Sequence, residues 1–268
     1  MQHGIWKNGT VYGVAGGKLL ADGTVFDVAG GRTRIHGTGY GIPFGTELSS
    51  LAVGEAVYLN IGGAAAEFLI VQQGLPSATY YDSSCSGTWL LTRDIYTTQK
   101  WDASDNDYQN ADIHAYLNGM FLGLLDAGVQ SAVKQVKIPY WNGMGSGGKA
   151  ASGASGLSTK VFLLSCMEVG CSVYDSNLPT NGAKLAYFTS ASASSANSRR
   201  VAYYQGEAAS WWLRDPHLAG TSMAMSCNGQ SGYAGMVQGV SRTIAYGVRP
   251  ALILPDGVKV DADGTLIV

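Results

Sequence analysis

The sequence is poor in charged side chains, and this shortage limits the partners that the protein can have. Lys, Arg, Asp and Glu together make up 13% of the residues, about half the share that is usual in globular proteins. The formal net charge of −2 provides no attraction to nucleic acid or to anionic membranes. No apolar run is long enough to cross a bilayer. We therefore expect neither nucleic-acid binding nor membrane insertion.

Cysteine is scarce, and a secretion signal is missing. The N-terminus has no basic stretch followed by an apolar core, so we expect no signal peptide and synthesis in a cytoplasm. Cys166 and Cys171 lack a common zinc spacing, and Cys85 and Cys227 are isolated. Buried free thiols are the expected state in such a protein, with a disulfide or a metal site as the alternatives.

The sequence also lacks the signatures of common enzymes. The four histidines form no HExxH pattern, no GxSxG sequence surrounds a serine, and the glycine-rich runs lack a GK[ST] ending. We expect no enzyme activity, no catalytic residue and no cofactor. The one acidic cluster, formed by Asp102, Asp105, Asp107 and Asp112, lacks the glycine and the closing glutamate of a calcium loop. Helix capping explains it as well as calcium does, so no metal is expected.

Glycine, in contrast, is abundant, with 37 residues. The phrase Gly-Thr followed by an aromatic residue opens three copies of a repeat at Gly9, Gly23 and Gly37, each 14 residues after the last. A short regular period indicates a repeated supersecondary unit, and apolar alternation between glycines indicates short strands. Units this small cannot bury their own apolar face. Residues 1–46 are therefore expected to form β-repeats that attach the chain to a particle or to sister subunits.

The remaining chain shows few strong local signals. Strands are expected over 56–61 and 66–71, joined by a Gly-Gly turn, and a helix capped by Asn110 is expected to start at Ala111. A second helix should begin near Asp126. The glycine- and serine-rich stretches 142–156 and 189–198 are expected to be loops, and a β-hairpin is expected over 256–268.

Several motifs resemble a domain-of-unknown-function family that is common in phages and prophages of gut Firmicutes, whose members are described as phage structural or tail-associated proteins. The resemblance covers roughly residues 47–255. It rests on the segments 81–91, 113–118, 133–140, 162–165, 211–214 (Trp-Trp-Leu-Arg) and 247–252 (Gly-Val-Arg-Pro-Ala-Leu).

The closing pattern is also similar to C-type-lectin-like folds of the formylglycine-generating type, which include the variable proteins of diversity-generating retroelements. This resemblance implies an α+β class: a C-type-lectin-like domain over 47–255 with few helices and much loop, preceded by the short β-repeats and followed by the tail 256–268. It further implies that aromatic and arginine side chains brace the core. Because neighbouring residues of a strand face opposite sides, we expect one tryptophan in the core and the other partly covered. The bracing residues are Trp211, Trp212, Arg214 and Arg249.

The polar stretch 215–246 is the candidate binding region. Its small hydroxyl and amide side chains and its tyrosine resemble the composition of antibody contact loops, in which Tyr supplies rigid contact area. Ordinary surface strands and turns are the alternative explanation. The residues expected to contact a ligand are His217, Ser222, Ser226, Asn228, Gln230, Ser231, Tyr233, Gln238 and Arg242.

The resemblance and the composition together predict a non-enzymatic phage virion protein, tail-associated, that recognises a host-surface glycan or protein. Its other expected partners are virion proteins, through residues 1–46, and sister subunits in a homo-oligomer; a trimer is the symmetry common in tail fibres and spikes. The alternative is a purely structural capsid or tail decoration protein without host binding.

Overall fold

The computed structural model describes residues 4–7, 10–15, 18–21, 24–27, 33–35, 38–40, 45–171 and 178–268. Strands before residue 41 pair as three successive antiparallel hairpins, one for each sequence repeat. The repeat glycines Gly9, Gly23 and Gly37 lie outside the described residues. The predicted short strands are present on either side of these glycines, and they pair as hairpins. These strands are β1 (Gly4–Lys7), β2 (Thr10–Ala15), β3 (Lys18–Ala21), β4 (Thr24–Asp27), β5 (Thr33–Ile35) and β6 (Thr38–Tyr40).

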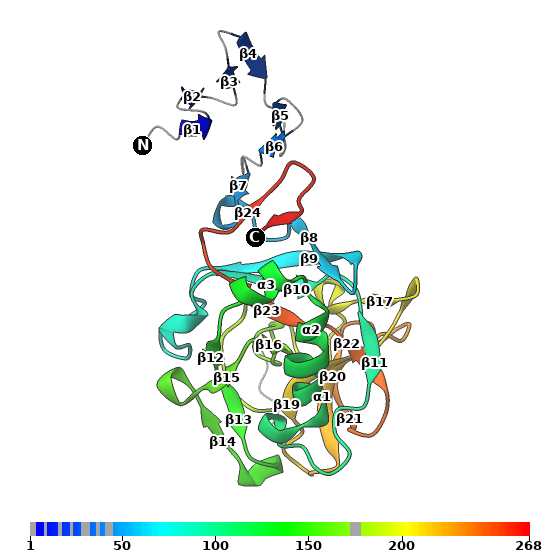
Figure 1. The fold of residues 1–268 in the computed structure, drawn as a ribbon. Coiled ribbons are helices and arrows are strands. Elements are labelled where there is room, and N and C mark those ends of the chain that lie inside the picture. Colours follow the sequence, from blue (N-terminus) through cyan, green and yellow to red (C-terminus); the bar gives the residue numbers. More distant parts are fainter. Residues whose placement is uncertain are drawn as a thin grey trace.

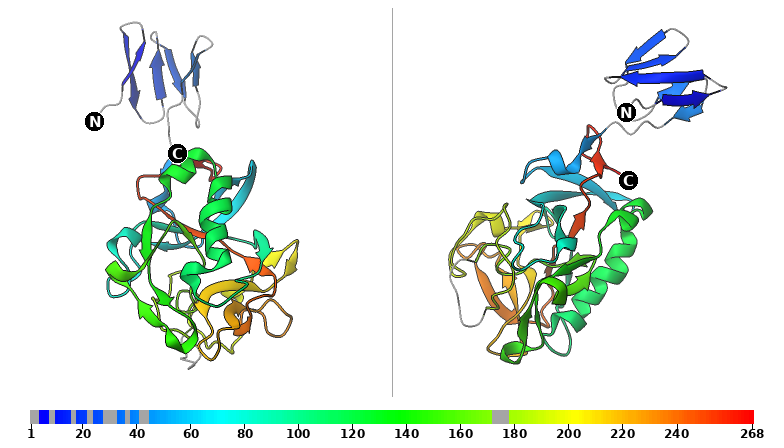
Figure 2. Two further views of the ribbon diagram at one scale, coloured as in Figure 1. Left: turned by 60° about the horizontal axis from the view of Figure 1, so that its bottom comes forward. Right: turned by 90° about the vertical axis from the view of Figure 1, so that its left-hand side faces the viewer.

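The first four of these strands form one sheet in the order β1-β2-β3-β4, and β5 pairs with β6. Figures 1 and 2 show the hairpins outside the main body, on the side where β7 (Thr46–Glu47) and the C-terminus lie. There β7 joins a three-stranded sheet with the tail strands β24 (Lys259–Val260) and β25 (Leu266–Ile267). The predicted tail hairpin is present, with Gly264 at a positive φ of 79° in its turn.

A five-stranded antiparallel sheet supports the core of the main body. Its order is β16 (Val161–Phe162), β23 (Ala251–Leu254), β10 (Thr88–Thr92), β9 (Ala64–Gln73) and β8 (Ala56–Ile61). The predicted hairpin of β8 and β9 is confirmed. Every residue of β10 and β23 is buried, so both faces of the sheet are covered at its centre. Trp89 on β10 packs edge-on against Tyr81 and Phe162.

A second five-stranded sheet positions the candidate binding region. Its order is β11 (Thr97–Gln99), β22 (Tyr246–Val248), β19 (Trp211–Pro216), β20 (Met223–Cys227) and β21 (Val237–Ser241). All neighbours are antiparallel except β19 and β22. Short strand pairs complete the body: β12 (Val136–Ile138) with β15 (Leu157–Thr159), β13 (Tyr140–Asn142) with β14 (Lys149–Ala151), and β17 (Tyr203–Tyr204) with β18 (Glu207–Ala208).

Helices within the described part of the chain cluster between residues 112 and 132. Helix α1 (Asp112–Tyr116) continues through a π-helical turn, η4 (Leu117–Phe121), into α2 (Leu122–Leu124), and α3 (Ala127–Ala132) follows. The prediction that Asn110 caps the first helix is wrong. Its amide donates to Asp107 instead, and the Asp102 carboxylate accepts the Asp112 N–H at 2.9 Å. Single 3₁₀ turns are η1 (Leu48–Ser50), η2 (Ser83–Cys85), η3 (Tyr108–Asn110), η5 (Gly145–Gly147), η6 (Gly153–Ser155) and η7 (Ser198–Arg200).

The predicted α+β class, with its C-type-lectin-like domain of much loop, is wrong. The protein is predominantly β, with 34% of residues in strands, 17% in helices and many small sheets. The difference arises over residues 136–159 and 203–248, which contain strands of two to six residues. Strands this short contain too few apolar and polar alternations for the period of two to be visible in sequence.

Candidate functional site

The residues predicted to contact a ligand fall at the two opposite ends of the β20–β21 hairpin. The register pairs Met223 with Ser241 at one end and Cys227 with Val237 at the other. A strand rises about 3.3 Å per residue, so the two ends lie about 13 Å apart along the strand. The structure therefore divides the single predicted face into two groups.

The first group lies in the loop that connects the two strands at the hairpin tip. Tyr233 is 56% exposed there, and Gln230 and Ser231 beside it are also exposed. The loop 192–199 lies against this tip, because the Asn197 N–H donates to the Ala234 carbonyl at 3.2 Å. We call the segments 192–199 and 228–236 together the tip surface.

Hydrogen bonds within the tip surface hold its backbone in one arrangement. The Asn228 N–H donates to the Met236 carbonyl, and the Gly235 N–H donates to the Asn228 carbonyl, each at 2.7 Å. The N–H of Val237, the first residue of β21, donates to the Ala193 carbonyl at 2.8 Å, which ties the first segment to that strand. A binding surface that is already ordered loses less entropy when a ligand docks.

Ser226 and Asn228 are buried, with 0% and 5% exposure, so they leave no surface for a ligand in this structure. The Asn228 Oδ1 accepts the Gln230 N–H at 2.8 Å, and its amide donates to the Gln238 side-chain oxygen at 3.2 Å. Asn228 and the half-buried Gln238 thus stabilise the backbone of the tip surface through these hydrogen bonds. The Ser226 hydroxyl faces the Gln238 carbonyl at 3.5 Å.

The second group, His217, Ser222 and Arg242, lies at the other end of the hairpin. Ser222 is exposed, while the other two are half-buried. The Arg242 guanidinium donates to the carbonyls of Thr221 and Asp102 at 3.1 and 3.0 Å, and also to that of Ser104. The guanidinium of Arg242 therefore fastens two loops together and is less available to a ligand.

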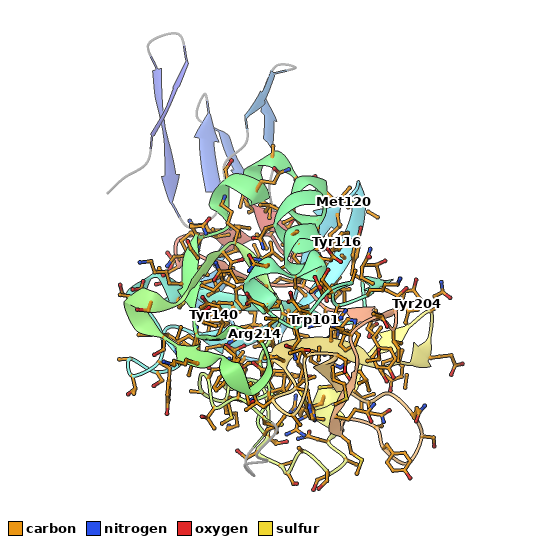
Figure 3. All side chains as sticks on the ribbon, turned by 90° about the horizontal axis from the view of Figure 1, so that it is seen from below. Trp101, Tyr116, Met120, Tyr140, Tyr204 and Arg214 are labelled. Atoms are coloured by element: carbon orange, nitrogen blue, oxygen red, sulfur yellow. The ribbon has the colours of Figure 1, made fainter. Side chains whose placement is uncertain are left out.

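Trp211, Trp212, Arg214 and Arg249 are all buried, with at most 1% exposure. The prediction that one tryptophan is only partly covered is therefore wrong. Both indole N–H groups donate to carbonyls, those of Arg200 and Gln99, and each ring is covered by the elements around β19. Figure 3 shows Arg214 in the interior among other buried side chains.

Arg214 and Arg249 have different partners in the interior. Arg214 forms an ion pair with Glu168, with Nη2 at 2.7 Å from Oε1, and the Tyr81 hydroxyl donates to the same oxygen at 2.9 Å. Arg249 lies over the Trp211 ring at 4.6 Å and donates to the carbonyls of Thr92 and Arg93. Burial lowers the pKa of Arg249 to about 10.

A polar network with shifted pKa values surrounds Arg214. Burial, reinforced by the Glu168 carboxylate, raises the pKa of Tyr81. Burial likewise raises the pKa of Asp215, whose oxygens accept the Cys166 N–H and the Asn181 amide. Shifted pKa values are common at catalytic sites, but these side chains are sealed from solvent. The network is therefore suited to holding segments together, since a substrate has no access to it.

All four cysteines are buried and free, which confirms the prediction of buried free thiols. Burial raises the pKa of Cys166, while a hydrogen bond from the Cys166 thiol is the main cause that lowers the pKa of Cys171. The two thiols therefore lie close together, at the ends of a turn closed by the Cys171 N–H and the Cys166 carbonyl at 3.0 Å.

The acidic cluster near α1 is used for backbone capping. The Asp102 carboxylate accepts N–H groups from Ser104, Asp105 and Asp112, and the Asp112 carboxylate accepts the Ala103 N–H. Backbone donors lower the pKa of Asp102 against the opposing effect of burial, which is the largest single contribution. Within the described ranges, no group of three or more His, Cys, Asp or Glu side chains is arranged to hold a metal ion.

The sequence did not indicate the importance of Arg200, which is fully buried. Its guanidinium donates to the carbonyls of Val169, Ser192, Gly235 and Ala191, so it links the two segments of the tip surface to the core. One signal was available: Arg199 and Arg200 form a basic pair directly after an uncharged Ser- and Ala-rich stretch. A cation in such a position is a candidate for binding loop carbonyls.

The family model of a domain of unknown function, DUF6273, matches residues 86–256, which is more than half of the chain. The match includes all strands of the second sheet and the tip surface. No curated protein and no solved structure matches the chain. Across the part of the chain that the structure describes, no helix is long and apolar enough to cross a membrane.

Proposed function

The chain belongs to the DUF6273 family of domains of unknown function, and we propose that it is a non-enzymatic recognition protein whose tip surface binds a cell-surface glycan or protein. The carrier that we propose is a phage particle, on the basis of the motif resemblance described above. The hairpins of residues 1–46 attach the protein to that particle and to sister subunits.

The exposed Tyr233 on a braced loop is the observation that carries this proposal. Among the aromatic side chains that the structure describes, Tyr233 is the most exposed, at 56%, and hydrogen bonds hold its loop in one arrangement. Tyrosine supplies rigid contact area at low entropic cost, and small polar neighbours supply adaptable hydrogen bonds. Such exposed polar side chains, Gln230, Ser231 and the serines of 194–198, lie in the same two hydrogen-bonded segments as Tyr233.

The chemistry of the tip surface favours a neutral, hydroxyl-rich or amide-rich partner. Its exposed side chains are hydroxyls, an amide, one phenol and the methyl group of Ala196, with Arg199 as the only charged side chain in its two segments. Arg199 itself is stacked on the Tyr187 ring at 4.7 Å. A tyrosine ring packs against the C–H face of a sugar, while the hydroxyl and amide groups pair with sugar hydroxyls.

The test compares Tyr233→Ala with Tyr80→Ala in the full-length protein. Tyr80 is a matched control, because it is 40% exposed and lies outside both segments of the tip surface, where its carbonyl accepts the Gly153 N–H at 2.9 Å. Binding is measured on arrays of bacterial envelope polysaccharides and, by flow cytometry, on intact bacterial cells. An interface aromatic contributes about 2 kcal/mol or more, so Tyr233→Ala should weaken binding at least ~10-fold, and Tyr80→Ala should not.

Two results would contradict the proposed function. Wild-type protein that binds neither the polysaccharides nor the cells would favour the alternative of structural decoration. Equal binding by the wild type and Tyr233→Ala would remove the tip surface as the binding site.

A further inference from the structure

Asparagine followed directly by glycine is a chemically labile pair, and the sequence contains several copies of it. The backbone nitrogen of the glycine attacks the side-chain amide carbon of the asparagine, and glycine favours this step because it has no Cβ atom to restrict the backbone. The attack requires a glycine N–H without a hydrogen bond and an asparagine side chain that is free to turn. The asparagines of these pairs are Asn8, Asn118, Asn142, Asn181 and Asn228.

Both reacting groups of the Asn228–Gly229 pair are held by hydrogen bonds. The Gly229 N–H donates to the Ser210 hydroxyl at 3.0 Å. The Asn228 side chain accepts the Gln230 N–H at 2.8 Å and donates to the Gln238 side chain at 3.2 Å. These bonds must break before the side chain and the glycine nitrogen can meet, so the fold protects this pair.

Asn118 and Asn181 are also held in place. The Asn118 side-chain oxygen accepts the N–H groups of Lys160 and Val161 at 3.0 and 3.1 Å. Asn181 is 2% exposed, and its amide donates to the Asp215 carboxylate at 3.0 Å. Asn8 lies outside the described residues.

Asn142 differs from these three asparagines, because it is exposed and its side chain is not held. It is the last residue of β13, and Gly143 begins the loop to β14 at the periphery of the main body (Figure 1). Among the residues that the structure describes, neither the Asn142 side chain nor the Gly143 N–H has a hydrogen-bond partner. Gly143 has a φ of 103°, which a residue with a Cβ atom rarely adopts.

From this contrast, we propose that Asn142 is a site of spontaneous deamidation, which converts it to aspartate or isoaspartate. The Gly143 nitrogen forms a bond to the Asn142 Cγ atom and loses its proton, while the side-chain nitrogen leaves as ammonia. Water then opens the cyclic imide. Cleavage of the new bond to Cγ gives aspartate, and cleavage of the bond to the main-chain carbonyl carbon gives isoaspartate. One water is consumed and one ammonia is released, with no change of oxidation state.

The modification changes the charge and the backbone of the β13–β14 hairpin. One carboxylate is added to a chain whose formal net charge is −2. The register pairs Asn142 with Lys149, and opposite charges at paired positions of neighbouring strands attract each other. Aspartate at this position therefore fits the hairpin.

Isoaspartate, in contrast, adds a methylene group to the main chain directly before Gly143. The backbones of Gly143 and Gly148 are so close that a Cβ atom on Gly143 would lie 3.1 Å from the Gly148 Cα atom. The loop therefore has to rearrange around the longer chain. This chemistry does not depend on the proposed recognition function, since it involves no residue of the tip surface.

The test follows the full-length protein during prolonged incubation at mildly alkaline pH, with trypsin digestion and mass spectrometry of the samples. Trypsin releases Asn142 in the peptide 138–149, which contains no other amide side chain. In the folded protein, Asn142 should convert at least ~10-fold faster than Asn118, Asn181 and Asn228, because the hydrogen bonds of those three must open first. In guanidinium chloride, where the fold is lost, the four rates should become similar.

Asn142→Gln is the matched control, because its side chain is longer by one methylene and must close a larger ring. Its peptide 138–149 should stay unmodified over the same period. A protein isoaspartyl methyltransferase with S-adenosylmethionine should methylate this peptide from the incubated wild type and not from the variant. Wild-type protein in which Asn142 stays intact, or converts no faster than the three held asparagines, would overturn the proposal.

Discussion

Arg214 and Glu168 form an ion pair in which both side chains have 0% exposure. Taking two charges out of water is expensive, and the attraction between them offsets that cost only when further hydrogen bonds satisfy the remaining donors and acceptors. Here Arg214 also donates to the carbonyls of Pro139 and Leu163, and Glu168 accepts from Tyr81 and from the Ser165 N–H. Three segments that are distant in sequence, at Tyr81, Pro139 and residues 163–168, are thereby fastened to β19.

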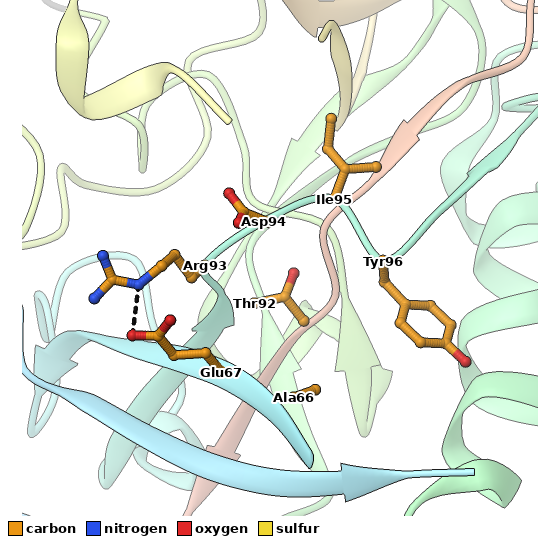
Figure 4. Close-up of a pocket in the computed structure, with 7 residues that line it drawn as sticks. All are labelled: Ala66, Glu67, Thr92, Arg93, Asp94, Ile95 and Tyr96. Carbon is orange, nitrogen blue, oxygen red and sulfur yellow. Dashed lines mark ion pairs between the residues drawn. The ribbon is translucent and has the colours of Figure 1, made fainter. Parts of the chain in front are cut away.

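Glu168→Gln should lower the free energy of unfolding by about 3–5 kcal/mol, because it removes the carboxylate that is paired with the buried Arg214 guanidinium. The measurement is equilibrium urea denaturation. Glu67→Gln is the control, since the Glu67–Arg93 pair (Figure 4) is exposed and such pairs contribute about 1 kcal/mol or less. Equal effects of the two substitutions would show that the buried pair has no special contribution to stability.

At the scale of elements, the loop between β20 and β21 depends on two glycines with positive φ. Gly232 has a φ of 83° and open space around the position of a Cβ atom. Gly235 has a φ of 79°, and a Cβ atom there would lie 2.0 Å from the Asn197 carbonyl oxygen. The close approach of the Gly235 and Asn197 backbones joins the two segments of the tip surface.

Gly232→Ala should cost about 1–2 kcal/mol for the left-handed conformation alone. Gly235→Ala should add about 1–3 kcal/mol for the overlap with Asn197, and it should also weaken binding at the tip surface. Urea denaturation of both variants measures the two losses of stability. The loss of binding is measured on Gly235→Ala with the same assay as for Tyr233→Ala. Indistinguishable stabilities would mean that the two loops can separate at little cost.

For the molecule as a whole, the main body contains an extensive apolar core. Among the residues whose side chains the structure describes, the buried apolar cluster extends from Leu48 to Val260. The first strand that joins the main body is β7, which pairs with β24 through Glu47 and Lys259. A cut before Gly45 therefore removes the hairpins and keeps every strand of the body.

Deletion of residues 1–44 should change the Tm by less than about 2 °C, since 1 kcal/mol corresponds to about 2–4 °C for a domain of this size. The sedimentation coefficient should fall to that of a monomer if the hairpins assemble the protein, as we propose. Differential scanning calorimetry and analytical ultracentrifugation measure the two quantities. A large loss of Tm would contradict an independent body, and an unchanged assembly would contradict the attachment role.

The sequence by itself determined the features that depend on neighbouring residues. The Gly-Gly turn between β8 and β9, the 14-residue hairpin repeat and the tail hairpin follow from turn chemistry that acts over a few positions. The Asn110 cap was predicted wrongly by the same local reasoning, because the helix receives its cap from Asp102, ten residues before Asp112.

Only the tertiary structure decided the β class, the sheet order and the division of the binding region. Strand β23 lies between β10 and β16, so residues more than 150 positions apart in the chain share one sheet. Which polar side chains of 215–246 reach solvent depends on such long-range packing: Tyr233 is exposed because Arg200 and Asn197 hold its loop from another segment, while Asn228 is buried beneath it. Tyr233 and Asn228 lie in the same polar stretch of the sequence, so its composition does not distinguish them. The contacts that expose one and bury the other form only when the chain is folded.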